Sequence, residues 1–272
     1  MTNKLEIQHL TVAYEERSGK NPKLYTALRD VSFDVAEGQF VSVIGSSGCG
    51  KSTLLGVLEG LIEPSGGRVL IDGAPVRGPG TDRGVVFQQY SLFPWMTARR
   101  NVAFGVRQAH RKLRRAEVYA LADEYLERVG LGEAKHRYPS RLSGGMQQRV
   151  AIARALAMDT DILLMDEPFG AVDAKTRVLL QELLLELWQR ERKRKTVVFI
   201  THDLDEAIFL SDRIIMLTEA PGSVYRDIAV DFPRPRERLE LMSGAKYAEF
   251  RERLTELFFG THKQERAEDW AI

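Results

Sequence analysis

The chain has 272 residues, of which 44% are hydrophobic and 28% charged, and its 39 Lys and Arg against 38 Asp and Glu give a net charge of +1. This composition is typical of a globular protein and excludes a disordered chain or one built mainly of membrane spans, and because the charge gives no global field that would attract nucleic acid, we expect no nucleic-acid partner. A single cysteine, Cys49, and an N-terminus without a basic segment followed by an apolar one predict a protein of the reducing cytoplasm that reaches a membrane only by docking.

Strand patterns and helical patterns alternate along most of the chain. Alternating apolar residues at 5–7 and 31–35 predict half-exposed strands of an antiparallel sheet. Buried parallel strands are predicted for five short apolar runs, at residues 40–44, 85–87, 162–165, 197–200 and 214–217. A leucine-rich helix is predicted from Thr176 onward. Together these elements predict a layered α/β fold that binds its ligands at the carboxyl ends of the parallel strands.

Two segments depart from this alternation. Residues 91 to about 157 are mostly helical by pattern and lie between two core strands, which predicts an inserted helical subdomain. Beyond Glu219 the sequence predicts a proline-punctuated connection and then an amphipathic helix over residues 245–259. We therefore divide the chain into a domain of residues 1–218 and a short C-terminal extension of residues 219–272.

The segment GSSGCGKST, residues 45–53, follows a predicted strand and precedes a helical pattern. Its Gly-x-x-x-x-Gly-Lys-Ser spacing is typical of a phosphate-binding loop, although a glycine-rich turn is the alternative interpretation. The glycines let backbone N–H groups surround phosphate oxygens, Lys51 supplies a positive charge to the β and γ phosphates, and the Ser52 hydroxyl can coordinate Mg²⁺. The residues expected to contact nucleotide here are Gly45, Ser46, Ser47, Gly48, Cys49, Gly50, Lys51, Ser52 and Thr53.

The position of Cys49 predicts a reactive thiol. It lies within this loop, near Lys51 and a helix N-terminus, and both features favour the thiolate form of a cysteine. We therefore expect a reactive thiol whose modification by a bulky group blocks nucleotide binding and which ATP protects against alkylation.

The segment ILLMDEP, residues 162–168, places two acids at the end of a predicted buried strand. Asp166 is expected to hold Mg²⁺ through water, and Glu167 to orient or deprotonate an attacking water molecule. An acidic turn before Pro168 is the alternative. Adjacent acids favour hydrolysis of the nucleotide over simple storage, and the sequence displays no acceptor pocket that would indicate a phosphotransfer kinase.

The segment LSGGMQQR, residues 142–149, comes before ILLMDEP. Ser143 is expected to cap a helix whose first N–H groups are left uncovered by Gly144 and Gly145. In this order the motifs resemble the ATP-binding-cassette ATPases, and the resemblance extends to about residue 218. It implies a RecA-like P-loop NTPase core, of α/β class, with an antiparallel β subdomain and an inserted α-helical subdomain.

The resemblance also implies roles for residues that would be weak signals alone. Tyr14 resembles the aromatic residue that stacks on adenine, and Gln88 the glutamine that touches Mg²⁺ and water. Val172 and Asp173 resemble the loop at the dimer contact, with Asp173 near the nucleotide, and His202 resembles the switch histidine that faces the γ-phosphate. The implied catalytic residues are Lys51, Gln88, Glu167 and His202, and the implied Mg²⁺ ligands are Ser52, Gln88 and Asp166.

The family mechanism requires two such domains. It implies that this chain associates head to tail with a second copy of itself or with a paralogous ATPase subunit. Each ATP would then lie between residues 45–53 of one subunit and residues 143–145 of the other. Dimer closure would assemble the site, and product release would let the pair reopen.

Partners are indicated by residues 89–101, QYSLFPWMTARRN. Its apolar side chains either form an exposed patch for a partner or pack the helical subdomain, and the pattern leaves both interpretations open. The side chains in question are Tyr90, Leu92, Phe93, Trp95 and Met96. In the family this region receives a cytoplasmic helix of a transmembrane partner.

Sequence segments outside the shared motifs indicate one subfamily of these ATPases. RGPGTDRGVVFQ, DEPFGAVDAKTR and THDLDEAIFLSDR resemble the ATPase subunits of bacterial importers for nitrate, taurine and other sulfonates. This implies a peripheral subunit at the cytoplasmic face of the inner membrane, with permease subunits, an indirectly engaged solute-binding protein, and a small anionic or zwitterionic solute that this subunit never touches.

Two other classes of ATP-binding protein are alternatives to an importer subunit. A soluble cassette ATPase of DNA repair or protein-complex assembly usually carries coiled coils or zinc-binding cysteines, and this chain has one Cys and no sustained heptads. A non-catalytic ATP-dependent clamp would not need Glu167 and His202.

Overall fold

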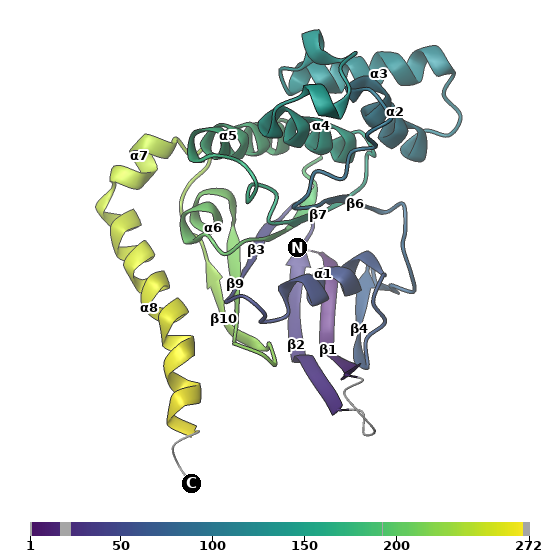
Figure 1. Cartoon of the computed structure of the whole chain (residues 1–272). Helices are drawn as coiled ribbons and strands as arrows, with labels where there is room; N and C mark the ends of the chain where they lie inside the picture. The colour runs from purple at the N-terminus through teal and green to yellow at the C-terminus, as the bar shows by residue number, and fades with distance from the viewer. Residues whose placement is uncertain (1, 17–22, 192, 269–272) are drawn as a thin grey trace. The chain divides into compact units, whose positions relative to one another are not determined.

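The computed structural model describes residues 2–16, 23–191 and 193–268. The chain divides into two compact units, which we describe separately (Figure 1). Unit 1 comprises Met1–Pro79 and Phe199–Ile272, and unit 2 comprises Gly80–Val198. The predicted division into residues 1–218 and 219–272 follows motifs rather than contacts and stays a prediction.

An antiparallel sheet forms the N-terminal part of unit 1. Its strands are β1 (Asn3–Glu16), β2 (Lys23–Ala36), β4 (Gly66–Ile71) and β5 (Ala74–Pro75), in the order β2-β1-β4-β5. Leu5 of β1 is opposite Val35 of β2, and Ile7 is opposite Phe33, so the alternating apolar residues meet on one buried face. The antiparallel pairing predicted for the first two strands is therefore confirmed, whereas β4 and β5 were not predicted.

Parallel pairing in unit 1 joins β3 (Phe40–Ile44) to β9 (Arg213–Leu217). Every residue of β3 is buried, which explains its continuous apolar run. A third strand, β10 (Val224–Ala229), pairs antiparallel with β9. The proline-punctuated connection predicted beyond Glu219 therefore contains a strand that was not predicted, because the residues of β10 do not alternate between apolar and polar side chains.

The described residues of unit 1 form four helices: α1 (Lys51–Glu59), α6 (Leu204–Leu210), α7 (Arg238–Ser243) and α8 (Ala245–Glu268). The predicted C-terminal helix thus begins where expected and continues nine residues beyond 259. Its buried residues Tyr247 and Leu254 pack in one cluster with Ile44 of β3 and Ile208 of α6. The C-terminal helix therefore contributes buried residues to the core of unit 1.

In the part of unit 2 that the structure describes, the strands β6 (Arg83–Val86) and β7 (Ile162–Asp166) pair in parallel, and the chain forms four helices. The helices are α2 (Ala98–Ala109), α3 (Arg115–Arg128), α4 (Gly144–Leu156) and α5 (Ala174–Arg190), with short 3-10 turns at Gly132–Ala134 and Pro139–Arg141. The helices α2, α3 and α4 pack on one another, and α4 also contacts α5 and β6. Strand β8 (Thr196–Ile200) contains the boundary with unit 1. The bounds predicted for a helical subdomain, 91 to about 157, stay a prediction.

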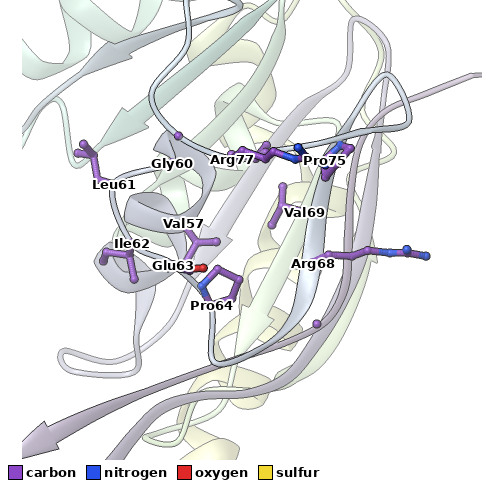
Figure 2. A pocket seen from close by; sticks show the side chains of 13 residues that line it. Val57, Gly60, Leu61, Ile62, Glu63, Pro64, Arg68, Val69, Pro75 and Arg77 are labelled. Carbon is purple, nitrogen blue, oxygen red and sulfur yellow. The ribbon is translucent and has the colours of Figure 1, made fainter.

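A cavity of about 720 Å³ lies in unit 1 between the end of α1 and the strands β4 and β5 (Figure 2). Val57, Ile62, Val69 and Arg68 line it, and the Arg68 side chain donates a hydrogen bond to Gln8. No residue of the segment 45–53 contributes to this cavity, so it is distinct from the predicted phosphate loop. Among the helices in the described part of the chain, none has both the length and the apolar composition to cross a bilayer.

Candidate functional site

The predicted phosphate loop connects the end of β3 to the start of α1 in unit 1. Gly50 lies immediately before α1 with φ of 96°, a left-handed conformation that favours glycine. A Cβ atom at this position would also lie 2.6 Å from Leu28 Cδ2 and 2.8 Å from the Ala27 carbonyl oxygen. The turn into the helix therefore requires glycine, and the first N–H groups of α1 are presented as an anion-binding end.

Lys51 is the first residue of α1 and is 8% exposed. Its Nζ donates hydrogen bonds to the carbonyl oxygens of Gly45 and Ser46, each at 2.8 Å. The ammonium group is therefore held over the loop by backbone carbonyls rather than extended into solvent. Phosphate oxygens can replace these carbonyls as acceptors, with the advantage of opposite charge.

Tyr14, from β1 of the antiparallel sheet, lies beside the phosphate loop. Its hydroxyl donates a hydrogen bond of 3.2 Å to Thr53 Oγ1 in the first turn of α1, and its side chain remains 38% exposed. The structure therefore brings the residue predicted to stack on adenine to the loop predicted to bind phosphate. Ser47, Gly48 and Ser52 of the loop are exposed, and Ser46 is half-buried.

The expectation of a reactive Cys49 is contradicted. The side chain is fully buried, and burial raises the pKa of the Cys49 thiol even though the nearby Lys51 acts in the opposite direction. The reason is that the loop folds the thiol inward, where a Cβ on Gly45 would lie 2.6 Å from Sγ. Cys49 therefore packs the underside of the loop, and its thiolate is disfavoured.

Slow alkylation of Cys49 is the expected consequence. At pH 8, iodoacetamide should modify native protein at least about tenfold more slowly than protein unfolded in urea, because burial limits both access and thiolate formation. Mass spectrometry of the peptide containing Cys49 measures both rates. Equal rates in the native and unfolded protein would show that the thiol is accessible and would contradict its burial.

His202 lies in unit 1, between β8 and α6, and is exposed. The preceding residue, Thr201, donates its backbone N–H to the Val43 carbonyl of β3 at 3.3 Å. The loop carrying His202 therefore begins beside the end of the strand that leads into the phosphate loop. Unit 1 thus gathers Tyr14, residues 45–53 and the segment of His202.

Unit 2 carries the paired acids. Asp166 ends β7, and Glu167 follows with φ of 40°, and both side chains are half-buried. A left-handed conformation is uncommon for glutamate and costs energy, which is typical of residues held in place at functional sites. A Cβ on Gly170 would lie 3.4 Å from Gln88 Nε2 and 3.8 Å from Glu167 Oε2. The structure therefore brings Gln88 and Glu167 to the same small space.

The predicted signature segment begins α4 in unit 2. Ser143 caps the helix as predicted, accepting a hydrogen bond from the Met146 N–H at 3.3 Å. A Cβ on Gly144 would lie 2.6 Å from the Tyr90 hydroxyl and 3.8 Å from Val172 Cγ1. Tyr90 therefore covers Gly144, a contact that the sequence pattern did not indicate because it marked Tyr90 only as apolar.

Asp173 caps the neighbouring helix α5. Its carboxylate accepts a hydrogen bond from the Thr176 N–H at 3.0 Å, and hydrogen bonds from Thr176 lower the pKa of Asp173. The loop at Val172 and Asp173 and the signature segment therefore lie side by side within unit 2.

The apolar segment after Gln88 is partly exposed. The Phe93 ring packs at a tilt against Trp95 and edge to face against Phe104, with ring centroids 5.6 and 4.9 Å apart. Trp95 is 66% exposed and Phe104 40%, whereas Tyr90 and Met96 are half-buried. Both interpretations of this segment hold in part, since the aromatic cluster of Phe93, Trp95 and Phe104 combines packing with an exposed apolar surface.

The side chains predicted to hold a metal ion fit Mg²⁺ by their chemistry. Ser52, Gln88 and Asp166 offer a hydroxyl, an amide and a carboxylate oxygen, which are the ligands Mg²⁺ prefers. In the described residues no group of three His, Cys, Asp or Glu could hold a metal ion. One carboxylate with neutral oxygens suits an ion that also binds substrate phosphates.

Comparison with known proteins gives three similarities. The ABC transporter family model matches residues 28–170. The nitrate import ATP-binding protein NrtD of Synechococcus elongatus is 50% identical over 228 residues, covering 84% of this chain and 82% of that protein. The bicarbonate transport ATP-binding protein CmpC of the same organism is 48% identical over 243 residues, covering 89% of this chain and 36% of that protein.

A solved structure is similar along most of its length. A dimeric ATP-binding cassette in a post-hydrolysis state, bound to ADP and Pi, matches with a TM-score of 0.73 and 35% identity, covering 84% of this chain and all of that one. This likeness confirms the α/β fold of P-loop NTPase type that the sequence predicts.

Proposed function

The chain belongs to the ABC transporter family and is an ATPase of that family, and we propose that it powers the import of a small anion or zwitterion such as nitrate, a sulfonate or taurine. The observation that carries the catalytic part is the convergence of Gln88 and a strained Glu167 beside Gly170. The solute class is supported by the 50% identity to a nitrate import protein. It is also supported by the segments outside the shared motifs, which resemble the ATPase subunits of importers for nitrate, taurine and other sulfonates.

ATP binding is assigned to unit 1. Tyr14 contacts the adenine, while the N–H groups of residues 45–53 and the ammonium of Lys51 bind the phosphates. Support comes from the hydrogen bond that joins Tyr14 to Thr53 and from the position of Lys51 over the loop. Lys51 changes acceptors, from the carbonyls of Gly45 and Ser46 to the β and γ phosphates.

Hydrolysis is assigned to the acids, the glutamine and the histidine. Ser52, Gln88 and Asp166 would hold Mg²⁺, which would supply positive charge that screens the phosphates. Glu167 accepts a proton from the attacking water molecule, which Gln88 helps to orient. His202 donates a hydrogen bond to the γ-phosphate oxygen on which negative charge increases.

Dimerisation completes the proposed site. The N–H groups at the start of α4, with the Ser143 hydroxyl and Gly144 and Gly145, bind the γ-phosphate of the ATP held by a second copy or a paralogous subunit. Asp173 lies at the same end of unit 2 and contacts the partner near the nucleotide. Support comes from the dimeric state of the similar cassette with ADP and Pi.

Import requires a permease, and the aromatic cluster of Phe93, Trp95 and Phe104 is the surface we assign to it. Its exposed apolar area suits a short apolar helix end of a membrane protein. The protein then acts as a peripheral subunit at the cytoplasmic face of the membrane. A solute-binding protein on the other side selects the solute and engages this subunit only through the permease.

Bicarbonate is a second candidate solute. The 48% identity to a bicarbonate transport protein nearly equals the identity to the nitrate import protein. Both are small planar oxyanions, and the solute never contacts this subunit, so the choice between them is made by other subunits.

Affinity purification tests the partner. Tagged protein with Glu167→Gln is expressed in its native cell, membranes are solubilised in mild detergent with ATP and Mg²⁺, and the recovered proteins are identified by mass spectrometry. We expect a polytopic permease. Recovery of soluble proteins or nucleic acid in its place would refute the importer while leaving the ATPase assignment intact.

A further inference from the structure

The loop that carries His202 is tied on both sides to the first turn of α6. Asp203 caps α6, with its Oδ1 accepting from the N–H groups of Asp205 at 2.9 Å and Glu206 at 3.1 Å. Thr201 Oγ1 donates to Glu206 Oε2 at 2.5 Å and accepts from the Asp203 N–H at 3.0 Å. Since both chain neighbours of His202 bond to this turn, the position of the turn determines the position of His202.

The C-terminal helix holds the same turn from the other side. Asp205 Oδ1 accepts hydrogen bonds from the Tyr247 hydroxyl at 2.6 Å and from Arg251 Nε at 2.7 Å, and Arg251 Nη2 lies 3.4 Å from Oδ2. Tyr247 and Arg251 are four residues apart and so share a face of α8. We call these three side chains, Asp205, Tyr247 and Arg251, the Asp205 clamp.

The bonds of the Asp205 clamp are strong ones. Tyr247 is 4% exposed, and burial together with its bond to Asp205 raises the pKa of the hydroxyl. Burial alone would raise the pKa of Asp205, but the hydrogen bonds from Arg251 and Tyr247 outweigh it and lower that pKa. The clamp therefore consists of charge-assisted hydrogen bonds to an ionised carboxylate, which are stronger than neutral ones.

The C-terminal extension also holds the far end of α6. Arg236 is buried and donates from Nη1 to the carbonyl oxygens of Ile208, Phe209 and Ser211, at 2.8, 3.0 and 2.8 Å. Arg234 Nη2 donates to the Leu210 carbonyl at 2.6 Å. Because both ends of α6 are bonded to residues 234–251, the C-terminal extension contributes to the position of the helix.

We propose that the Asp205 clamp fixes the loop of His202 in the orientation that hydrolysis requires, so that Tyr247 and Arg251 are positioning residues for the ATPase reaction. The inference rests on the role proposed above for His202. The C-terminal extension thereby contributes to catalysis separately from its packing in the core. Phe232, Leu254 and the ring of Tyr247 pack in the core, whereas the polar contact with Asp205 is made by the Tyr247 hydroxyl.

Three variants isolate the clamp. Tyr247→Phe removes the hydroxyl and keeps the packed ring, Arg251→Gln removes the charge, and the double variant removes both donors. Arg253→Gln is the matched control, because Arg253 is an exposed arginine of the same helix. Thermal unfolding of all four proteins checks that folding is retained, and Tyr247→Phe keeps the test valid if the double variant unfolds.

Steady-state hydrolysis is the first readout. We expect kcat to fall about threefold in Tyr247→Phe and about tenfold in the double variant, with KM for ATP unchanged, because the phosphate loop is untouched. Arg253→Gln should match the wild type. A rise in KM without a fall in kcat, or equal kcat in all variants, would overturn the proposal.

Amide hydrogen exchange is the second readout and needs no catalysis. The N–H groups of Asp203, Asp205 and Glu206 should exchange about tenfold faster in the double variant, while a peptide covering residues 45–53 is unchanged. Unchanged exchange at residues 203–206 would show that the clamp does not hold the loop and would refute the proposal.

Combination with His202→Ala separates this proposal from the function on which it rests. In that background the clamp variants should lower the residual hydrolysis rate no further, because they act through His202. A further tenfold loss would refute action through His202. If His202→Ala alone kept the wild-type rate, the role of His202 would fail, whereas faster exchange at residues 203–206 would still show that the clamp holds the loop.

Discussion

Replacing Glu167 by glutamine is expected to lower kcat for ATP hydrolysis by about 100- to 1,000-fold, the usual contribution of a general base, while ATP still binds. The glutamine side chain has the shape of the glutamate it replaces but cannot accept the proton of the attacking water molecule. The left-handed backbone at this residue holds either side chain in the same place. Without turnover, ATP remains bound, and we expect a stable dimer in size-exclusion chromatography with ATP and Mg²⁺.

Glu186→Gln is the control for this substitution. Glu186 is an exposed residue of α5 that pairs with Arg190, so the same loss of charge occurs away from the motifs. It should hydrolyse ATP at the wild-type rate and remain monomeric once ATP is consumed. Wild-type turnover by Glu167→Gln would show that another group is the base.

Lys51→Met is expected to weaken ATP binding about 100-fold, equivalent to about 3 kcal/mol. Methionine keeps the length of the side chain but removes the charge that the phosphates attract, and it leaves the carbonyls of Gly45 and Ser46 without their donor. The rate of ATP hydrolysis should fall by at least the same factor. Titration with a fluorescent ATP analogue measures the affinity.

Lys195→Met is the matched control for the loss of a buried lysine. Lys195 is also buried, and its Nζ donates to the Thr160 carbonyl at 2.6 Å, but it belongs to no nucleotide motif. Its loss should reduce stability without changing affinity for ATP. Equal affinities for the Lys51→Met and wild-type proteins would contradict the assignment of the phosphate loop.

Features set by local spacing could be predicted from the sequence. The strand Phe40–Ile44 is continuously apolar because it is buried, and the glycines after it are required by the left-handed turn into α1. The capping of α4 by Ser143 follows from the chemistry of its hydroxyl at a helix start. Such signals depend on neighbours within a few residues, which a sequence displays directly.

Features set by burial or by distant contacts could not be predicted. Lys51 and the helix end suggested a reactive Cys49, but its burial, which raises the pKa of the thiol, depends on how the loop folds over it. The contact between Tyr90 and Gly144 joins residues 54 positions apart. The Asp205 clamp joins residues 42 and 46 positions apart, and neither Tyr247 nor Arg251 belongs to a motif.

The C-terminal extension is the clearest example of a feature set by distant contacts. Its sequence predicted a proline-punctuated connection and a helix, yet β10 extends the strand pairing of β9 and α8 completes the core cluster around Ile44. Residues beyond the family motifs therefore pack directly against the strand that precedes the phosphate loop. Truncation studies of this protein should treat residues 219–268 as part of the unit that binds nucleotide.

Uptake by the purified complex tests the central claim most directly. The permease recovered with this subunit is reconstituted in proteoliposomes with ATP and Mg²⁺ on the side of this subunit, and with its solute-binding protein on the other. We expect ATP-dependent accumulation of labelled nitrate, taurine, another sulfonate or bicarbonate, and its loss when Glu167→Gln protein replaces the wild type. Hydrolysis of ATP without accumulation of any of these solutes would contradict the importer of small anions and zwitterions proposed here.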